Sequence, residues 1–146
     1  MIIAVDKTNI SAAAEVHSAS WRESHRSFCA PDFIALHSPE RQREYIEKKM
    51  NAGSRFYMLV DGGPVGIVSV TGSLIEDLYV MPEKQGMGYG TELLRFAVRK
   101  CEGTPTLWIL ENNEKAAEFY RRKGFKATGR INAVADGIDE IEFILE

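Results

Sequence analysis

Residues 74–100 have the sequence LIEDLYVMPEKQGMGYGTELLRFAVRK. Apolar side chains dominate the first seven positions, glycines follow at positions 86, 88 and 90, and the last ten positions carry apolar residues at helical spacing. Pro82 cannot donate to a sheet ladder, so it predicts the end of a strand over 74–81. The segment therefore predicts a strand, a glycine-rich turn and an amphipathic helix over 91–100.

The glycine-rich turn suits an anionic ligand. The first turn of a helix leaves backbone N–H groups unpaired, and the helix dipole places partial positive charge there. Glycines allow a phosphate or pyrophosphate to approach those groups without a Cβ in the way. Spacing excludes two familiar motifs: a dinucleotide fingerprint would need glycine where Thr91 stands, and no Gly-Lys-Ser/Thr of a P-loop occurs.

Hydrophobic periodicity predicts the order strand, two helices, three strands, helix, strand, helix, two strands. This order indicates one α/β domain over residues 1–146 with a mixed sheet and a parallel crossover within 74–123. Thr8-Asn9 and Ser38-Pro39 are expected at helix starts, residues 28–36 as a loop or broken segment, and Asp136-Gly137 as a hairpin turn. The elements expected outside 74–100 are strands over about 1–5, 55–60, 65–70, 106–110, 126–134 and 138–145, and helices over about 10–26, 39–51 and 113–123.

Composition excludes several classes of protein. The 146 residues are 45% hydrophobic and 27% charged, typical of a soluble globular chain rather than a disordered one. Eighteen Lys+Arg against 21 Asp+Glu give a formal net charge of -3. The chain therefore lacks the excess of positive charge that is typical of nucleic-acid-binding domains. No apolar run is long enough for a membrane span, and the N-terminus lacks a signal-peptide pattern. Two cysteines and three histidines, none paired, fit a cytoplasmic protein without a metal site.

Gln85, Gly88 and Gly90 stand in the pattern Q-x-x-G-x-G. This pattern resembles the acetyl-CoA motif of the GNAT superfamily of N-acetyltransferases. The resemblance implies a mostly antiparallel sheet of about six to seven strands with about four helices. It also implies that backbone N–H groups of the turn hold the CoA pyrophosphate, that residues 78–80 pair with the pantetheine arm, and that the N–H of Leu78 polarises the thioester carbonyl. The residues it assigns to acetyl-CoA are Leu78, Tyr79, Val80, Gln85, Gly86, Met87, Gly88, Tyr89, Gly90, Thr91 and Asn113.

A second segment, residues 113–125, resembles the family pattern N-x-x-A-x-x-F-Y-x-x-x-G-F. Asn113 and Tyr120 are seven residues apart, so both lie on one helix face, with Ala116 or Ala117 between them. The resemblance implies that Asn113 contacts CoA and that the Tyr120 hydroxyl protonates the leaving thiolate. Without the motif, Tyr120 would be interpreted as a core aromatic residue.

The implied reaction is acetyl transfer to a primary amine of a small molecule, peptide or protein by direct attack in a ternary complex. Period-two alternation places Glu76 on one face with Leu78 and Val80, and Asp77 and Tyr79 on the other, which makes Glu76 the candidate general base. A solvated carboxylate is the alternative for Glu76.

Some family members carry the base on the following strand. The matching position here is Trp108, which cannot serve as a base. Glu111 or a chain of water molecules therefore remains open as another route for the proton.

Other hypotheses remain at this stage. The chain could be a non-catalytic acyl-CoA-binding module, or a nucleotide-binding domain that prefers ATP, and its last hairpin offers an edge for a homodimer. His17 and Trp21 fit either the core stripe of the first helix or a wall of the acceptor pocket, and His25 is expected at the surface. The basic run 121–123 fits dipole pairing at a helix end, with contact to a CoA phosphate as the alternative.

Overall fold

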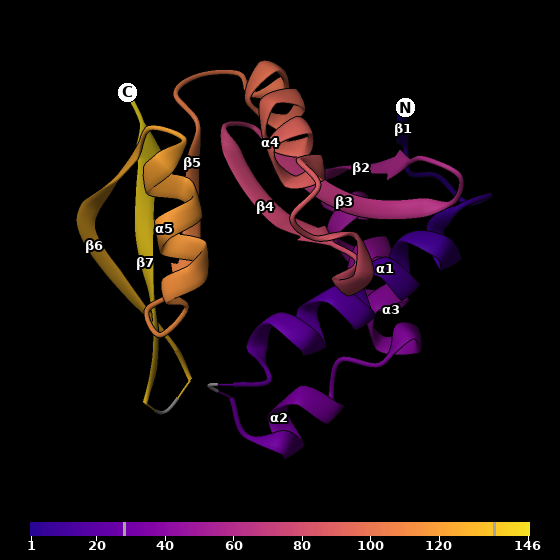
Figure 1. The fold of residues 1–146 in the computed structure, drawn as a ribbon, viewed down its shortest axis with the longest axis horizontal. Helices are drawn as coiled ribbons and strands as arrows, with labels where there is room; N and C mark the ends of the chain where they lie inside the picture. Colours follow the sequence, from indigo (N-terminus) through magenta and orange to yellow (C-terminus); the bar gives the residue numbers. More distant parts are fainter. Residues whose placement is uncertain (28, 136) are drawn as a thin grey trace.

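A computed structural model of the chain describes residues 1–27, 29–135 and 137–146. These residues form five α-helices, one 3₁₀ helix and seven strands, and the strands join in one sheet of order β1-β2-β3-β4-β5-β7-β6 (Figure 1). The elements are β1 Ile2–Ala4, α1 Ile10–His25, α2 Pro31–Ala35, α3 Pro39–Asn51, β2 Arg55–Val60, β3 Pro64–Thr71, β4 Leu74–Val80, η1 Pro82–Lys84, α4 Tyr89–Lys100, β5 Thr106–Leu110, α5 Glu114–Arg122, β6 Phe125–Ala135 and β7 Ile138–Leu145.

The sheet is mixed and mostly antiparallel, as predicted. Its neighbouring strands are antiparallel except for β4 and β5, which are parallel and joined through α4. A parallel pair needs such a crossover because the chain must return to the same end of the sheet. The predicted crossover within 74–123 is therefore confirmed.

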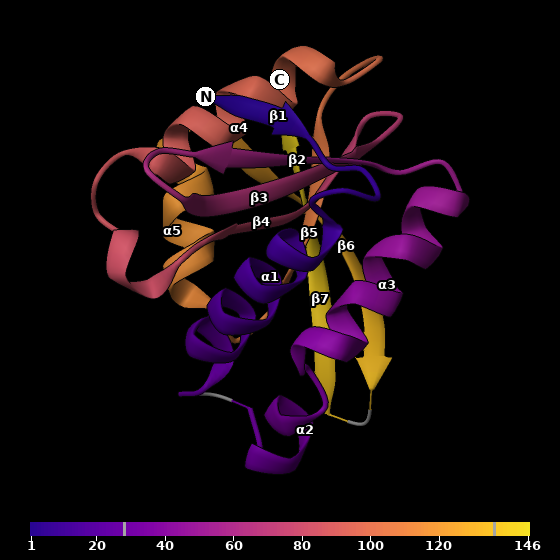
Figure 2. The same cartoon turned by 90° about the vertical axis from the view of Figure 1, so that its right-hand side faces the viewer.

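Two apolar cores lie on opposite faces of the sheet. Helices α1 and α3 pack side by side over β2 and β3, where Ile46, Phe56 and Ile67 are almost fully buried (Figure 2). On the other face α4 packs on β3 and β4, and this core continues to Phe125 and Phe143 beside α5. The two cores hold β4 between α1 on one side and α4 on the other.

The helix starts differ in how they are capped. Ser38 caps α3 as predicted, because its Oγ accepts from the N–H of Arg41 at 3.3 Å, and Pro39 takes the first helical position. Asn9 does not cap α1 with its side chain. Its Oδ1 instead accepts from the N–H of Asp6 at 2.8 Å, and its Nδ2 donates to the carbonyl of Ala4 at 3.0 Å.

Two local predictions need correction. The segment 28–36, expected as a loop or broken segment, contains the helix α2, which begins at Pro31, because proline at the first helical position has a preset φ. Helix α4 begins at Tyr89, two residues before the predicted start. Phe28 and Asp136 lie outside the described residues, so the predicted hairpin turn is seen only at Gly137, which has a φ of +73°.

Candidate active site

The glycine-rich turn connects β4 to α4 and is kept open by its backbone. Gly86 and Gly88 have φ angles of +79° and +88°, in the left-handed region that favours glycine. A Cβ added at either position would meet no described atom within 4 Å. Gln85 steadies the turn, because its Nε2 donates to the carbonyl of Val80 at 3.2 Å. Backbone conformation, rather than crowding, thus requires glycine here, and the space around the turn is free for a ligand.

Helix α4 begins at this turn without a side-chain cap. Its N-cap is Gly88, whereas α3 and α5 are capped by the side chains of Ser38 and Asn113. The first N–H groups of α4 are therefore left for a ligand or solvent, and the helix dipole makes their surroundings favourable to an anion. Lys84 and Lys115 line the cleft near the turn and add positive charge.

A cleft of about 1510 Å³ lies between β4 and β5 and reaches α1, α2 and α5. Within the described residues, the ladder between β4 and β5 holds the pair Leu74–Thr106 alone. Beyond this pair the two strands diverge (Figure 1), which leaves one edge of β4 without a strand partner. Unpaired backbone groups along a strand edge can pair with an extended ligand as another strand would.

Most of the residues assigned to acetyl-CoA lie along this cleft. Met87 is not among its lining residues and is 62% exposed at the outside of the turn. Glu111, an alternative base, does not line the cleft either. The assigned residues that do line it are Leu78, Tyr79, Val80, Gln85, Gly86, Gly88, Tyr89, Gly90, Thr91 and Asn113.

Strand β4 contains a bulge that overturns the predicted faces. Ser69 of β3 pairs with Glu76, and Ile67 pairs with Tyr79, so two steps along β3 match three steps along β4. The extra residue lets Asp77 join Glu76 and Tyr79 on the face that carries α1 and α3. The prediction that Glu76 shares a face with Leu78 and Val80 is therefore wrong, because those two side chains pack in the other core.

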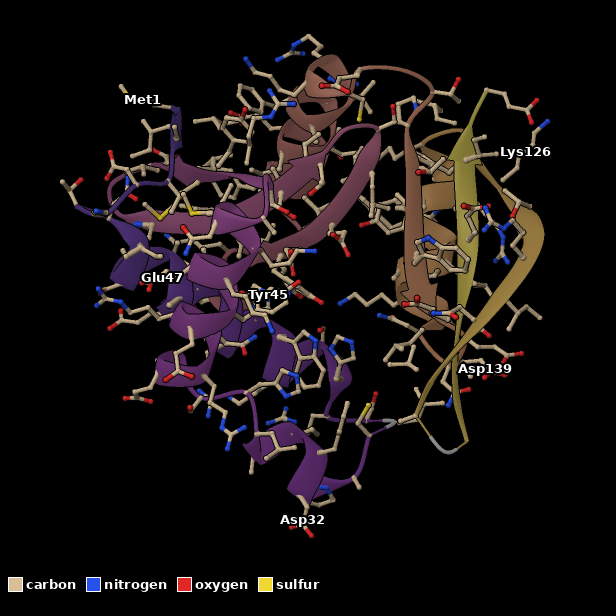
Figure 3. All side chains as sticks on the ribbon, turned by 180° about the vertical axis from the view of Figure 1, so that it is seen from behind. Met1, Asp32, Tyr45, Glu47, Lys126 and Asp139 are labelled. Carbon is tan, nitrogen blue, oxygen red and sulfur yellow. The ribbon has the colours of Figure 1, made fainter. Side chains whose placement is uncertain are left out.

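Asp77 is the centre of a buried polar network. Its carboxylate accepts hydrogen bonds from His17 Nε2 at 2.8 Å, Ser69 Oγ at 2.9 Å and Tyr45 Oη at 3.1 Å. Figure 3 shows Tyr45 pointing from α3 toward the interior of the molecule. Burial tends to raise the pKa of Asp77, but the hydrogen bonds outweigh it and hold that pKa below its usual value. The carboxylate is therefore ionised in the folded protein.

Glu76 lies beside this network and is paired with a lysine. Its Oε1 is 2.6 Å from Nζ of Lys49 on α3, and about a third of each side chain is exposed. Glu76 also lines the cleft. An ion pair of this exposure contributes little to stability, so a ligand that competes for the carboxylate can displace the lysine at small cost.

Tyr120 lies on α5 and is 8% exposed. Its ring packs edge-on against Phe119 and Phe125, with ring centroids 5.2 and 5.7 Å away, while the residue still lines the cleft. Burial, and then the negative charge of Asp77, raise the pKa of the Tyr120 phenol. The hydroxyl is therefore protonated and available as a donor.

Asn113 lies at the start of the same helix. Its Oδ1 accepts from the N–H of Ala116 at 3.1 Å, so the side chain first serves as the helix cap. Ala116 lines the cleft with Asn113, whereas Ala117 is buried in the core. Of the two alanines considered, Ala116 is thus the one that leaves room beside Tyr120.

The opposite end of the cleft is lined by stacked rings. The indole of Trp21 stacks on the imidazoles of His25 and His37, with ring centroids 4.0 and 3.4 Å away, and Phe33 closes the group. His25 is only 5% exposed, so the prediction of a surface position is wrong. Burial lowers the pKa of His25 to about 4 and also lowers that of His37, so both imidazoles are neutral near neutral pH.

This burial predicts a pH-dependent stability. As the pH falls below 6.5 the unfolded chain takes up a proton at His25, while the folded chain does so only near pH 4. Protonation then favours the unfolded state, and we expect His25 to remove up to about 3 kcal/mol of stability between neutral pH and pH 4.

Urea denaturation across this range tests the expectation. The His25→Phe variant, which keeps a flat ring beside Trp21, should lose less stability on acidification than the unmodified protein. Equal losses in both proteins would contradict the expected pH dependence.

Comparison with known proteins identifies the family. The family model described as "Acetyltransferase (GNAT) domain" matches residues 52–127, more than half of the chain. The chain belongs to the GNAT acetyltransferase family. The peptidyl-lysine N-acetyltransferase YjaB of Salmonella typhimurium is 37% identical to it over 67 residues, a match that covers 46% of each chain. The matched part is thus less than half the length of that relative. The protein named "Probable N-acetyltransferase Rv2775" of Mycobacterium tuberculosis is 28% identical over 129 residues, 80% of this chain and 74% of that one.

Solved structures agree with the GNAT fold. The PaiA N-acetyltransferase of Thermoplasma acidophilum, crystallised with coenzyme A, superposes with a TM-score of 0.68 at 19% identity, covering 97% of this chain and 96% of that one. At this identity the similarity concerns the fold. The predicted GNAT-like sheet is therefore confirmed, with five α-helices among the described residues where about four were predicted.

The GNAT chain shows neither a metal centre nor a membrane-spanning helix in the parts described. In residues 1–27, 29–135 and 137–146, no three His, Cys, Asp or Glu side chains come together in a way that could bind a metal ion. No helix within the same ranges combines the length and the apolar character needed to cross a bilayer.

Sequence reasoning missed Asp77 and Tyr45 of this GNAT site. One signal was available for Asp77: aspartate is rare in strand interiors, so its position within the apolar run 74–80 already indicates an irregular strand. Tyr45 gave no such signal, because a tyrosine in the apolar stripe of a helix is usually a core residue.

Proposed function

We propose that this protein transfers an acetyl group from acetyl-CoA to a primary amine, by direct attack in a ternary complex. The proposal depends most on the divergence of β4 from β5, which leaves an unpaired strand edge between the glycine-rich turn and Tyr120. An extended pantetheine arm can pair with that edge, and the N–H groups of the turn can hold the pyrophosphate. Holding both reactants in one cleft removes up to about 7–11 kcal/mol of the barrier in ideal geometry.

Two groups act on the thioester in this proposal. The backbone N–H of Leu78, directly after the bulge, donates to the thioester carbonyl and stabilises the oxyanion that forms on attack. The Tyr120 hydroxyl donates toward the sulfur as the thiolate leaves. The raised pKa of the Tyr120 phenol keeps the hydroxyl protonated, so it can donate a hydrogen bond to the sulfur as negative charge develops there.

Glu76 is proposed as the base that removes the proton of the amine. Its carboxylate lines the cleft and is paired with Lys49, a partly exposed ion pair, so it can accept a proton directly or through water once the lysine is displaced. We expect Glu76→Gln to lower turnover more at neutral pH than at high pH, because an amine that is already deprotonated needs no base. Rates measured across this pH range, with Glu111→Gln as the control outside the cleft, check this. A Glu76→Gln rate that stays equal to that of the unmodified protein at every pH would exclude Glu76.

The acceptor is proposed to enter past the stacked rings of Trp21, His25 and His37. The carboxylates of Glu76 and Glu140 line the cleft, and the imidazoles of His25 and His37 are neutral, which favours a cationic acceptor. YjaB relatives are named peptidyl-lysine N-acetyltransferases. A lysine-containing peptide is therefore the first acceptor to test, followed by polyamines and small amines.

A thermal-shift titration tests the cofactor. Acetyl-CoA and CoA should raise the melting temperature while ATP should not, since a ligand at a hundredfold excess over its Kd adds about 2.7 kcal/mol of stability. A shift with ATP alone would favour a nucleotide-binding domain, and no shift with acetyl-CoA would overturn the proposal.

The second candidate is a non-catalytic acyl-CoA-binding module, which the ion pair between Glu76 and Lys49 favours because it occupies the proposed base. This candidate predicts that acetyl-CoA raises the melting temperature while no amine releases CoA from it.

A further inference from the structure

Asp77 has an unusual backbone for a residue in a strand. It is the one non-glycine residue with a positive φ, +55°, in the part of the chain that the structure describes. Only a few residue types enter this region readily, and aspartate and asparagine are among them. The next residue is Leu78, whose N–H is proposed to bind the thioester carbonyl. The conformation of Asp77 therefore sets the direction of that N–H.

Three elements hold the Asp77 carboxylate in place. Oδ1 accepts from His17 on α1, Oδ2 accepts from Ser69 on β3, and the Tyr45 hydroxyl on α3 lies 3.1 Å from both oxygens. Gln42 Nε2 lies 2.6 Å from His17 Nδ1 and can donate to it, which leaves the Nε2 proton of His17 for Asp77. The bulge is thus tied to both helices on its face of the sheet.

We propose that this network, consisting of Asp77, His17, Tyr45, Ser69 and Gln42, is a positioning device that fixes the bulge of β4 and aims the Leu78 N–H at the thioester carbonyl. The inference rests on the proposed acetyl transfer. Asp77 is a positioning residue rather than a base, because its two carboxylate oxygens already accept hydrogen bonds from three side chains.

The surroundings of the network support a geometric role. The core on this face of the sheet is apolar and includes Ile46, Phe56 and Ile67. Replacing buried polar groups with packed apolar ones is often neutral or stabilising, so stability alone does not account for a cluster of this size. A bulge that must keep one N–H in a fixed direction does account for it, because catalysis is sensitive to misplacement of about 1 Å.

Ser69 allows a clean test, since it is fully buried and does not line the cleft. The Ser69 hydroxyl donates to Asp77, so Ser69→Ala removes one hydrogen bond of the network and leaves the other side chains of the cleft in place. We expect it to lower kcat about tenfold, with the KM for acetyl-CoA changed less than about threefold. The matched control is Ser54→Ala, because Ser54 is also buried and its hydroxyl bonds to Thr71, outside the network. This control should leave kcat unchanged.

Asp77→Gly removes the hydrogen bonds of the network but keeps the positive φ that the bulge requires. Glycine adopts the positive φ without strain but cannot accept the three hydrogen bonds. We expect kcat to fall about a hundredfold in this variant. Wild-type kcat in a folded Asp77→Gly or Ser69→Ala protein, or a loss confined to KM, would overturn the inference. If Asp77→Gly fails to fold, Ser69→Ala decides alone.

A second readout does not need an acceptor. The amide signal of Leu78 in a ¹H–¹⁵N spectrum should differ between the acetyl-CoA and CoA complexes of the unmodified protein, and this difference should shrink in Ser69→Ala but not in Ser54→Ala. An equal difference in all three proteins would overturn the inference. Absence of turnover in the unmodified protein would overturn the proposed function instead, while the Leu78 signal would still decide the role of the network.

Discussion

Replacing Tyr120 with phenylalanine should lower kcat by about 10²- to 10³-fold, within the range that positioned acids and bases supply. The variant keeps the ring that packs against Phe119 and Phe125 and loses only the hydroxyl, so the fold and the binding of acetyl-CoA should change little. A loss of this kind belongs to an interaction made as the thiolate leaves, and it should appear in kcat rather than in the Kd for acetyl-CoA. Steady-state CoA release and a binding titration measure the two quantities.

Tyr57→Phe is the matched control for this experiment. Tyr57 lies on β2 and packs edge-on against Phe96, with ring centroids 4.8 Å apart, and it does not line the cleft. Its substitution should leave kcat unchanged. If Tyr120→Phe keeps more than about a third of the original kcat, the leaving thiolate needs no proton from Tyr120 and the assignment of a general acid is wrong.

Replacing Gly88 with valine should weaken the binding of acetyl-CoA by about a hundredfold. The φ of +88° at Gly88 is strained for any L-residue and most of all for a β-branched one, at a cost of about 1–3 kcal/mol. Relief of that strain would move the N–H groups at the start of α4, and the new side chain would stand where the pyrophosphate approaches. Isothermal titration with acetyl-CoA measures the change.

Gly62 provides an equivalent change away from the cleft. It has a φ of +73° in the turn between β2 and β3, and a Cβ there would also meet no described atom within 4 Å. Gly62→Val should therefore lose similar stability while it binds acetyl-CoA normally. Equal affinity in Gly88→Val and Gly62→Val would show that the glycine-rich turn does not hold the pyrophosphate.

The order of the elements and the glycine-rich turn could be predicted because both depend on neighbouring residues. Apolar spacing separates helices from strands, Pro82 marks the end of β4, and Gly124 ends α5 with a φ of +96°. The turn could be recognised because its glycines fall at fixed intervals between a strand and a helix. These features depend on residues that are close together in the sequence, so they could be predicted without knowing the rest of the fold.

The faces of β4 could not be predicted in this way. Period-two alternation assumes a regular ladder, and a single bulge at Asp77 reverses the assignment of Glu76. The groups that hold the bulge come from α1, α3 and β3, so the cause lies up to sixty residues away along the chain. The aspartate within the run 74–80 indicates an irregular strand, but the long-range hydrogen bonds that hold the bulge leave no local pattern in the sequence.

The position of His25, at the other end of the cleft, could not be predicted from the sequence either. His25 was expected at the surface. The chain instead returns through α2, and His25 is buried beside Trp21 with its Nδ1 2.8 Å from the Trp21 carbonyl. Helical spacing could place His17, Trp21 and His25 on related faces, but it could not show what would cover them.

The most direct test of the proposed acetyl transfer is to follow the acetyl group itself. The purified protein would be incubated with acetyl-CoA labelled with ¹³C in the acetyl group and with a lysine-containing peptide, a polyamine or a small amine. Mass spectrometry of the amine and assay of the released thiol would follow both products. We predict that at least one amine gains the labelled acetyl group in step with CoA release, and that Tyr120→Phe abolishes most of this transfer. Binding of acetyl-CoA without acetylation of any amine would contradict the proposed reaction and favour the non-catalytic module.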